Sequence, residues 1–177
     1  MRETIPDGWT WWRIADAAWQ NPLDPNFARR HGGRWNPPAS YPTLYLNEDK
    51  VTSRLNLRAF IATWPYEPED LRADTGPVLI GATMPRHQEV CDLHTPQGLK
   101  AAGLPKTYPV GKSGRLVPHA KCQPVGEAVR KEGLKGVRVR SAQSPDGAGR
   151  ELAWFPATKR SRASLQIRLT FDEWYWT

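Results

Sequence analysis

The sequence contains only two cysteines, Cys91 and Cys122, which are too few for a disulfide framework. It has no apolar run of about 18 residues, the length that a membrane-spanning helix needs. The first residues, MRETIPDGWTWWRIAD, lack the uninterrupted apolar stretch of a signal peptide. We therefore expect a cytoplasmic protein that has no contact with a membrane.

Long helices are excluded from most of the chain by its 17 prolines, and no internal repeat is visible. The 177 residues fit one domain. Apolar patterning predicts strands at residues 10–15, 43–48, 77–84, 136–142 and 150–157, and one or two more strands within residues 164–176. It predicts helices at residues 47–64 and 124–136, a short helix or two turns at residues 94–104, and a loop at residues 20–28. We expect a single α+β domain over residues 1–177, with its core in about 10–157.

Acidic residues are scarce in the middle of the chain. Residues 91–140 hold ten Lys or Arg and three Asp or Glu, so this segment has the same net charge, +7, as the whole chain. Such a basic segment is typical of surfaces that meet nucleic acid, an acidic protein or an anionic substrate. An ordinary solvated face has the same composition, so these alternatives stay open.

Two patterns resemble ligand sites without meeting their requirements. The sequence GKS at residues 111–113 lacks the glycine that a phosphate-binding loop has five positions earlier, where Lys106 stands. Zinc-ligand residue types occur without the tight C-x2-C pairs of structural zinc sites, at His87, Cys91, His94, His119 and Cys122. We therefore expect no metal site.

The segment HGGRWNPPASYPTLYLNE, residues 31–48, combines features that core packing does not require. Two glycines before Arg34 allow the backbone to approach a ligand closely. The arginine presents a planar fork that binds phosphate through two hydrogen bonds. Tyr45 alternates with Leu44 and Leu46, so its side chain is expected on the opposite face of the strand. The alternative for Tyr45 is a half-buried strand aromatic with no role in binding.

Two further polar residues stand at positions that suit a site. Arg13 lies inside a predicted strand, where its charge requires an acidic partner or a polar pocket. Ser141 ends the predicted strand GVRVRS, where its hydroxyl either faces a ligand or caps a turn. Two arginines and an aromatic ring on neighbouring strands form an anion-plus-ring site, which suits a dinucleotide.

The order WWRIAD, GGRWNP, TLYLNE, a helix, GVRVRSA and RELAWF resembles the RES domain family over about residues 10–157. The resemblance implies a mixed sheet similar to the fold of ADP-ribosyltransferase toxins. It also implies a type II toxin that degrades NAD as its substrate, with water or phosphate as the acceptor. The implied partner is an Xre-type helix-turn-helix antitoxin whose tail blocks the active site, rather than nucleic acid, and self-association stays open.

Carried over residue by residue, the resemblance implies that Arg13 and Arg34 bind the NAD pyrophosphate. Tyr45 would stack on the nicotinamide ring, and Ser141 would bind the nicotinamide ribose or amide. Asn56 stands where the family has a glutamate, in the predicted helix VTSRLNLRAF. Asparagine can hold a ribose hydroxyl, but it offers no charge to a positively charged transition state.

The departure at Asn56 leaves three interpretations. The chain is a weakened or inactive member that binds a nucleotide or a partner, or another acid such as Glu48 or Glu67 supplies the charge. The third is that Asn56 is not the aligned position. An ADP-ribosyltransferase that acts on a macromolecule is a further alternative for the same fold.

Overall fold

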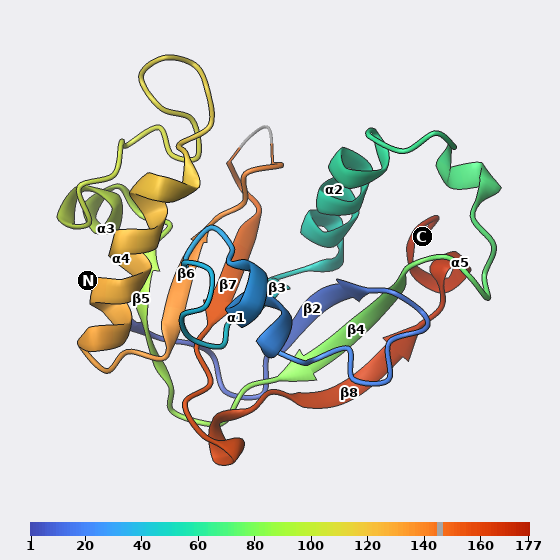
Figure 1. The fold of residues 1–177 in the computed structure, drawn as a ribbon, viewed down its shortest axis with the longest axis horizontal. Helices are drawn as coiled ribbons and strands as arrows, with labels where there is room; N and C mark the ends of the chain where they lie inside the picture. Colours follow the sequence, from blue (N-terminus) through green and yellow to red (C-terminus); the bar gives the residue numbers. More distant parts are fainter. Residues whose placement is uncertain (145–146) are drawn as a thin grey trace.

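The computed structural model describes residues 1–144 and 147–177 and contains one mixed eight-stranded sheet with the strand order β1-β5-β6-β7-β3-β2-β4-β8 (Figure 1). The strands are β1 (Arg2–Thr4), β2 (Thr10–Ala15), β3 (Leu44–Asn47), β4 (Val78–Thr83), β5 (Glu89–Leu93), β6 (Gly136–Arg140), β7 (Arg150–Trp154) and β8 (Ser164–Leu169). The β5–β6 pair is parallel and the other strand pairs are antiparallel. The prediction of an α+β mixed-sheet fold is therefore confirmed.

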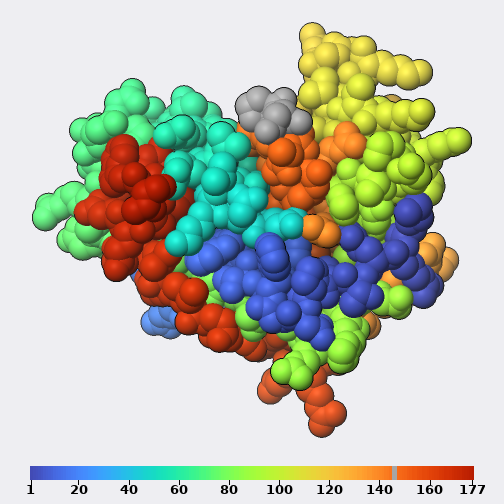
Figure 2. Space-filling model, turned by 180° about the vertical axis from the view of Figure 1, so that it is seen from behind, coloured from blue at the N-terminus to red at the C-terminus, as the bar shows by residue number. Residues whose placement is uncertain are grey.

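The α-helices among the described residues are α1 (Asn26–His31), α2 (Lys50–Ile61), α3 (Pro96–Ala101), α4 (His119–Lys131) and α5 (Phe171–Trp174). Helices α3 and α4 lie over β5 and β6 in one half of the molecule, and α2 lies near β2 and β3 (Figure 1). Figure 2 shows the C-terminal segment, in red, beside the teal residues of α2, where Arg54 donates a hydrogen bond to the carbonyl of Trp174. No described helix is long and apolar enough to cross a membrane.

The alternation of β3 and β7 separates the two faces of the sheet. Leu44, Leu46 and Leu152 enter one buried cluster, whereas Tyr45 and Ala153 pack against the cluster under α3 and α4. This confirms that Tyr45 faces away from the two leucines. Since Asn47 pairs with Glu151 at the end of β3, both side chains leave the sheet on the same face as Tyr45.

Two sequence expectations are wrong. Residues 26–28, expected in a loop, belong to helix α1, which ends at Gly32 (φ 75°). This short helix buries little apolar surface, so the sequence shows no periodic pattern for it. Helix α4 runs from His119 to Lys131 with Pro124 inside it, so the proline does not mark its start. The expectation of one or two strands within residues 164–176 is met by β8, and residues 171–174 form helix α5, where Glu173 accepts hydrogen bonds from both Thr170 N–H and Thr170 Oγ1–H. The strands β1 and β5 were not predicted.

Candidate active site

A cluster of four polar side chains, Asn47, Asn56, Ser141 and Glu151, lies where the central strands meet helix α2; we call it the polar cluster. Local sequence brings Asn47 and Asn56 together, and the pairing of β3 with β7 adds Glu151. Asn47 ends β3, and Asp49 caps α2 by accepting a hydrogen bond from Thr52 N–H at 2.6 Å. This cap starts the helix three residues after Asn47, so that Asn56 reaches back to Asn47 from the second turn.

Asn56 is the centre of the polar cluster. Its Nδ2 donates to Asn47 Oδ1 at 2.7 Å and to Glu151 Oε1 at 3.0 Å. Its Oδ1 lies 3.2 Å from Ser141 Oγ. Both N–H groups of this amide are therefore engaged, which fixes its orientation.

Ser141 is fully buried and lies directly after β6, where its N–H donates to Gly149 O at 2.9 Å. Its hydroxyl oxygen lies 2.7 Å from Glu151 Oε1, a shorter contact than that to Asn56, so its single hydrogen is directed to the carboxylate. The same oxygen accepts the backbone N–H of Gln143 at 3.2 Å. Ser141 thus stabilises the turn that follows β6 and also donates a hydrogen bond to Glu151 within the polar cluster.

The Tyr45 side chain extends from β3 to the GGRWN segment, residues 32–36, which carries Arg34. The Tyr45 hydroxyl accepts the N–H of Trp35 at 2.9 Å and donates to Asn36 Oδ1 at 2.8 Å. Burial raises the pKa of Tyr45 well above its usual range, which keeps the phenol neutral. A Cβ on Gly33 would lie 2.7 Å from the Tyr45 ring, so the second glycine is required for this contact.

The guanidinium of Arg34 anchors this segment to the region before α4. Its Nη1 donates to the carbonyl of Val117 at 2.7 Å and lies 4.0 Å from Cys122 Sγ. Burial raises the pKa of the Cys122 thiol, and the charge of Arg34 acts in the opposite direction. The net effect is a neutral thiol, as expected for a core cysteine.

Arg13 is set apart from the other predicted site residues. Its neighbours Trp12 and Ile14 pack against the cluster under α2, so Arg13 leaves β2 on the opposite face. Its guanidinium carbon lies 5.8 Å from the centre of the Trp19 ring. Burial lowers the pKa of Arg13 to about 10, with Asp24 raising it, so the side chain stays charged at neutral pH.

A cavity of about 720 Å³ reaches the polar cluster at Asn56. This volume lies in the range of small-molecule and cofactor sites. Aromatic side chains line it together with Asn56, namely Trp19, Phe27, Phe60, Trp64 and Tyr66. Arg34, Tyr45 and Ser141 are not part of its lining. The aromatic walls suit flat rings, and Asn56 offers a polar group at one point.

The structure thus joins Asn56 to Ser141 and Arg34 to Tyr45. It shows no hydrogen bond between Arg13 and the other four among the described residues. Glu151 was missed by the sequence analysis. Its signal was the alternation in RELAWF, which directs Leu152 and Trp154 into one core cluster and Glu151 to the face of Tyr45.

The acids suggested as substitutes lie elsewhere. Glu48 forms an ion pair with Arg138, whose Nη2 lies 2.6 Å from Glu48 Oε1. Glu67 caps the short 3-10 helix Pro68–Asp70. Neither carboxylate has a hydrogen bond to Asn56 among the described residues. Glu151 is therefore the acid that the structure offers to the polar cluster.

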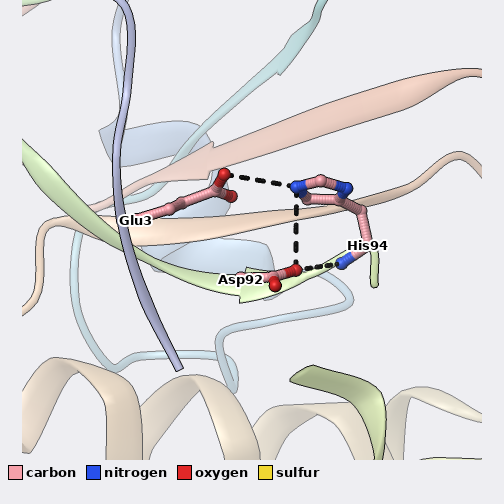
Figure 3. A group of neighbouring side chains, drawn as sticks. All are labelled: Glu3, Asp92 and His94. Atoms are coloured by element: carbon pink, nitrogen blue, oxygen red, sulfur yellow. Dashed lines mark hydrogen bonds and ion pairs between the residues drawn. The ribbon is translucent and has the colours of Figure 1, made fainter. Parts of the chain in front are cut away.

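Of the residues with zinc-ligand types, only His94 lies in a described group of close acidic and imidazole ligands, with Glu3 and Asp92 (Figure 3). His94 Nε2 lies 3.2 Å from Glu3 Oε2 and 3.6 Å from Asp92 Oδ1. Arg138 Nη1 also contacts Glu3 Oε2 at 3.1 Å, and Asp92 Oδ1 accepts the N–H groups of His94 and Thr95. These oxygens already have donors, so the group ties β1 to β5.

Comparison with known proteins gives three concordant matches. The RES domain family matches residues 10–174. Proteins named NAD(+) phosphorylase MbcT, from Mycobacterium tuberculosis and Mycobacterium bovis, are 32% identical over 147 residues, covering 82% of this chain and 72% of theirs. A crystal structure of the M. tuberculosis MbcT–MbcA toxin–antitoxin complex superposes with a TM-score of 0.72 at 27% identity, covering 98% of this chain and 92% of that one.

Proposed function

The chain belongs to the RES domain family, and we propose that it degrades NAD by breaking the bond between nicotinamide and ribose. The acceptor in our proposal is phosphate, which the name of the relatives, NAD(+) phosphorylase, supports. NAD is then the substrate and no metal takes part. The observation that carries the proposal is the polar cluster, with Asn56 and Ser141 both hydrogen-bonded to Glu151 and Asn56 opening onto an aromatic cavity.

The residues divide between the parts of the dinucleotide. Asn56, which lines the cavity, binds a hydroxyl group of the nicotinamide ribose through its Oδ1 acceptor, and the buried Ser141 acts from behind it through the hydrogen bond to Glu151. Tyr45 packs its neutral ring against the nicotinamide. Arg34 binds the pyrophosphate through the guanidinium nitrogens that do not contact Val117. Arg13 does not line the cavity; its guanidinium lies over the ring of Trp19, so it supports the cavity wall through that ring.

Purified protein with NAD and phosphate tests the reaction directly. We expect nicotinamide release that depends on phosphate, with ADP-ribose 1″-phosphate as the second product by ³¹P NMR. ADP-ribose formed at the same rate without phosphate would show that water is the acceptor. If the ADP-ribose part of NAD is labelled, label that becomes attached to a macromolecule would indicate an ADP-ribosyltransferase. NAD binding without turnover would indicate a binding module.

We also propose that the chain is the toxin of a type II toxin–antitoxin pair with an Xre-type antitoxin. The superposition on a toxin–antitoxin complex supports such a partner. The basic segment 91–140 includes the loop that protrudes between α3 and α4 (Figure 1) and carries Lys106, Lys112 and Arg115. These charges suit an acidic antitoxin tail. Expression of the chain is expected to arrest growth, and co-expression of an antitoxin gene from the same operon is expected to relieve the arrest.

A further inference from the structure

The polar cluster contains one carboxylate, and the proposed reaction needs a negative charge. We propose that Glu151 is the catalytic carboxylate, held and aimed by Asn56 and Ser141. This inference rests on the proposed function. Breaking the bond from nicotinamide to the ribose C1′ builds positive charge on the sugar, and an adjacent carboxylate stabilises that charge.

The hydrogen bonds orient Glu151 and leave one oxygen available. Oε1 accepts from Asn56 Nδ2 at 3.0 Å and from Ser141 Oγ at 2.7 Å. Oε2 has no hydrogen-bond partner among the described residues, and the side chain is partly exposed. A carboxylate fixed at one oxygen and open at the other is preorganised for a developing cation.

Neighbouring acids have other tasks in the structure. Glu48 is paired with Arg138, and Asp49 caps α2. Asp16 accepts the N–H of Ala18, and Asp24 contacts Asn26. Among the described residues, Glu151 is the acid that bonds to both Asn56 and Ser141.

The step balances without a further reactant. The C1′–N bond breaks and its electron pair goes to the nicotinamide nitrogen, which cancels the positive charge of the ring. A phosphate oxygen of HPO₄²⁻ forms the new bond to C1′, so no proton has to be removed. Glu151 forms no covalent bond. Asn56 and Ser141 act as positioning residues toward Glu151, and Asn56 also contacts the ribose.

Contact between Asn56 and Glu151 makes their exchange possible. A carboxamide and a carboxylate have nearly the same shape, and Asn56 Nδ2 lies 3.0 Å from Glu151 Oε1. In a variant with Asn56→Asp and Glu151→Gln, both changes conserve shape, the amide moves to the strand and the charge moves to the helix. The hydrogen bond between the two side chains is kept with its direction reversed, and the amide of Asn47, which loses the N–H it accepts from Asn56, turns over to donate. The negative charge therefore stays in the polar cluster.

Four proteins test the inference by initial rates of nicotinamide release at saturating NAD and phosphate, with thermal unfolding as the check on folding. They are wild type, Glu151→Gln, the exchange variant Asn56→Asp/Glu151→Gln, and the control Glu132→Gln on the exposed end of α4. We expect kcat to fall about 10²–10³-fold in Glu151→Gln with an unchanged KM. The control is expected to match wild type, and the exchange variant to recover at least tenfold over Glu151→Gln.

The other possible outcomes would contradict either the role of Glu151 alone or the proposed function as well. Wild-type turnover that survives in a folded Glu151→Gln variant overturns the role of Glu151 and leaves the proposed function standing. Absence of turnover in wild type overturns both. If Glu151→Gln does not fold, the exchange variant decides, because it keeps the partnering of the cluster. A folded exchange variant with no nicotinamide release would overturn the inference.

Discussion

Gly33 lies directly against the ring of Tyr45, so that a Cβ on the glycine would meet ring carbons Cε2 and Cζ at 2.7 Å. This contact lets the Tyr45 hydroxyl reach the N–H of Trp35 and the side chain of Asn36. The glycine pair of the GGRWN segment therefore has two different tasks. Gly32, with φ 75°, ends α1 in a left-handed conformation, and Gly33 makes room for the tyrosine.

We expect Gly33→Ala to lower the free energy of unfolding by about 1–3 kcal/mol, as overpacking of a filled site does. Urea unfolding followed by tryptophan fluorescence measures it. Gly111→Ala is the control, because the nearest atom to its added Cβ is 3.5 Å away, an ordinary contact. Equal unfolding midpoints for the two variants would show that Tyr45 can move aside at no cost.

Ser141→Ala removes a hydrogen bond to the Glu151 carboxylate without adding volume. A hydrogen bond to a charged group is worth about 1.5–3 kcal/mol, so we expect kcat to fall about ten- to a hundredfold. Steady-state nicotinamide release at several NAD concentrations separates kcat from KM. Ser144→Ala, in the neighbouring turn, serves as a comparison for loss of the local fold. A fall in thermal stability with an unchanged kcat would reduce Ser141 to its turn contact with Gln143.

Arg34 is expected to contribute to NAD binding through charge and through its planar fork. Arg34→Lys keeps the charge and loses the fork, whereas Arg34→Ala loses both. We therefore expect KM for NAD to rise in the order wild type, Lys, Ala. Isothermal titration with NAD on the Glu151→Gln background measures affinity without turnover. Equal affinities for NAD in the protein with Arg34 and in the Arg34→Lys and Arg34→Ala variants would show that Arg34 does not bind NAD.

Asp92 is expected to contribute stability that depends on pH. Burial acts to raise the pKa of Asp92, but hydrogen bonds from Thr95 and His94 outweigh it and lower the pKa below its usual range. Because the folded pKa is the lower one, this stabilisation is present above the unfolded pKa and is lost as pH falls through the folded pKa. We expect Asp92→Asn to lower the free energy of unfolding at pH 7 by about 1–3 kcal/mol.

The difference between Asp92→Asn and wild type should shrink as the pH is lowered from 4.5 to 2.5. Urea midpoints at four pH values in that range, on both proteins, give the difference. A constant difference across the range would mean that the carboxylate is not ionised in the folded protein and that only the shape of the side chain matters.

Apolar patterns in the sequence predicted the central strands and α2 because these elements bury one or both faces in the core. Strand β1 has three residues and β5 begins at an exposed glutamate, so neither gives a strong pattern. Helix α5 was predictable from T-x-x-E at Thr170 and Glu173, a capping box that precedes no long apolar run. Local patterns thus identify elements that fill the core, and short elements at the edge escape them.

The resemblance implies that Asn56 and Ser141 both lie at the nicotinamide ribose, so their proximity could be expected. The catalytic role that we propose for Glu151 could not. The acid lies 95 positions from Asn56 in the chain, and only the β3–β7 register brings the two together. Glu48 and Glu67 are the acids close to Asn56 in sequence, but contact in a sheet depends on strand order rather than on closeness along the chain. The sheet supplies an acid, so the asparagine at position 56 does not by itself imply an inactive protein.

The most direct test of the account is the time course of NAD and nicotinamide in a solution of the purified chain, NAD and phosphate, followed by ¹H NMR. The account predicts stoichiometric conversion of NAD to free nicotinamide over many turnovers, slowed about 10²–10³-fold by Glu151→Gln. NAD that stays intact with correctly folded wild-type protein would contradict it.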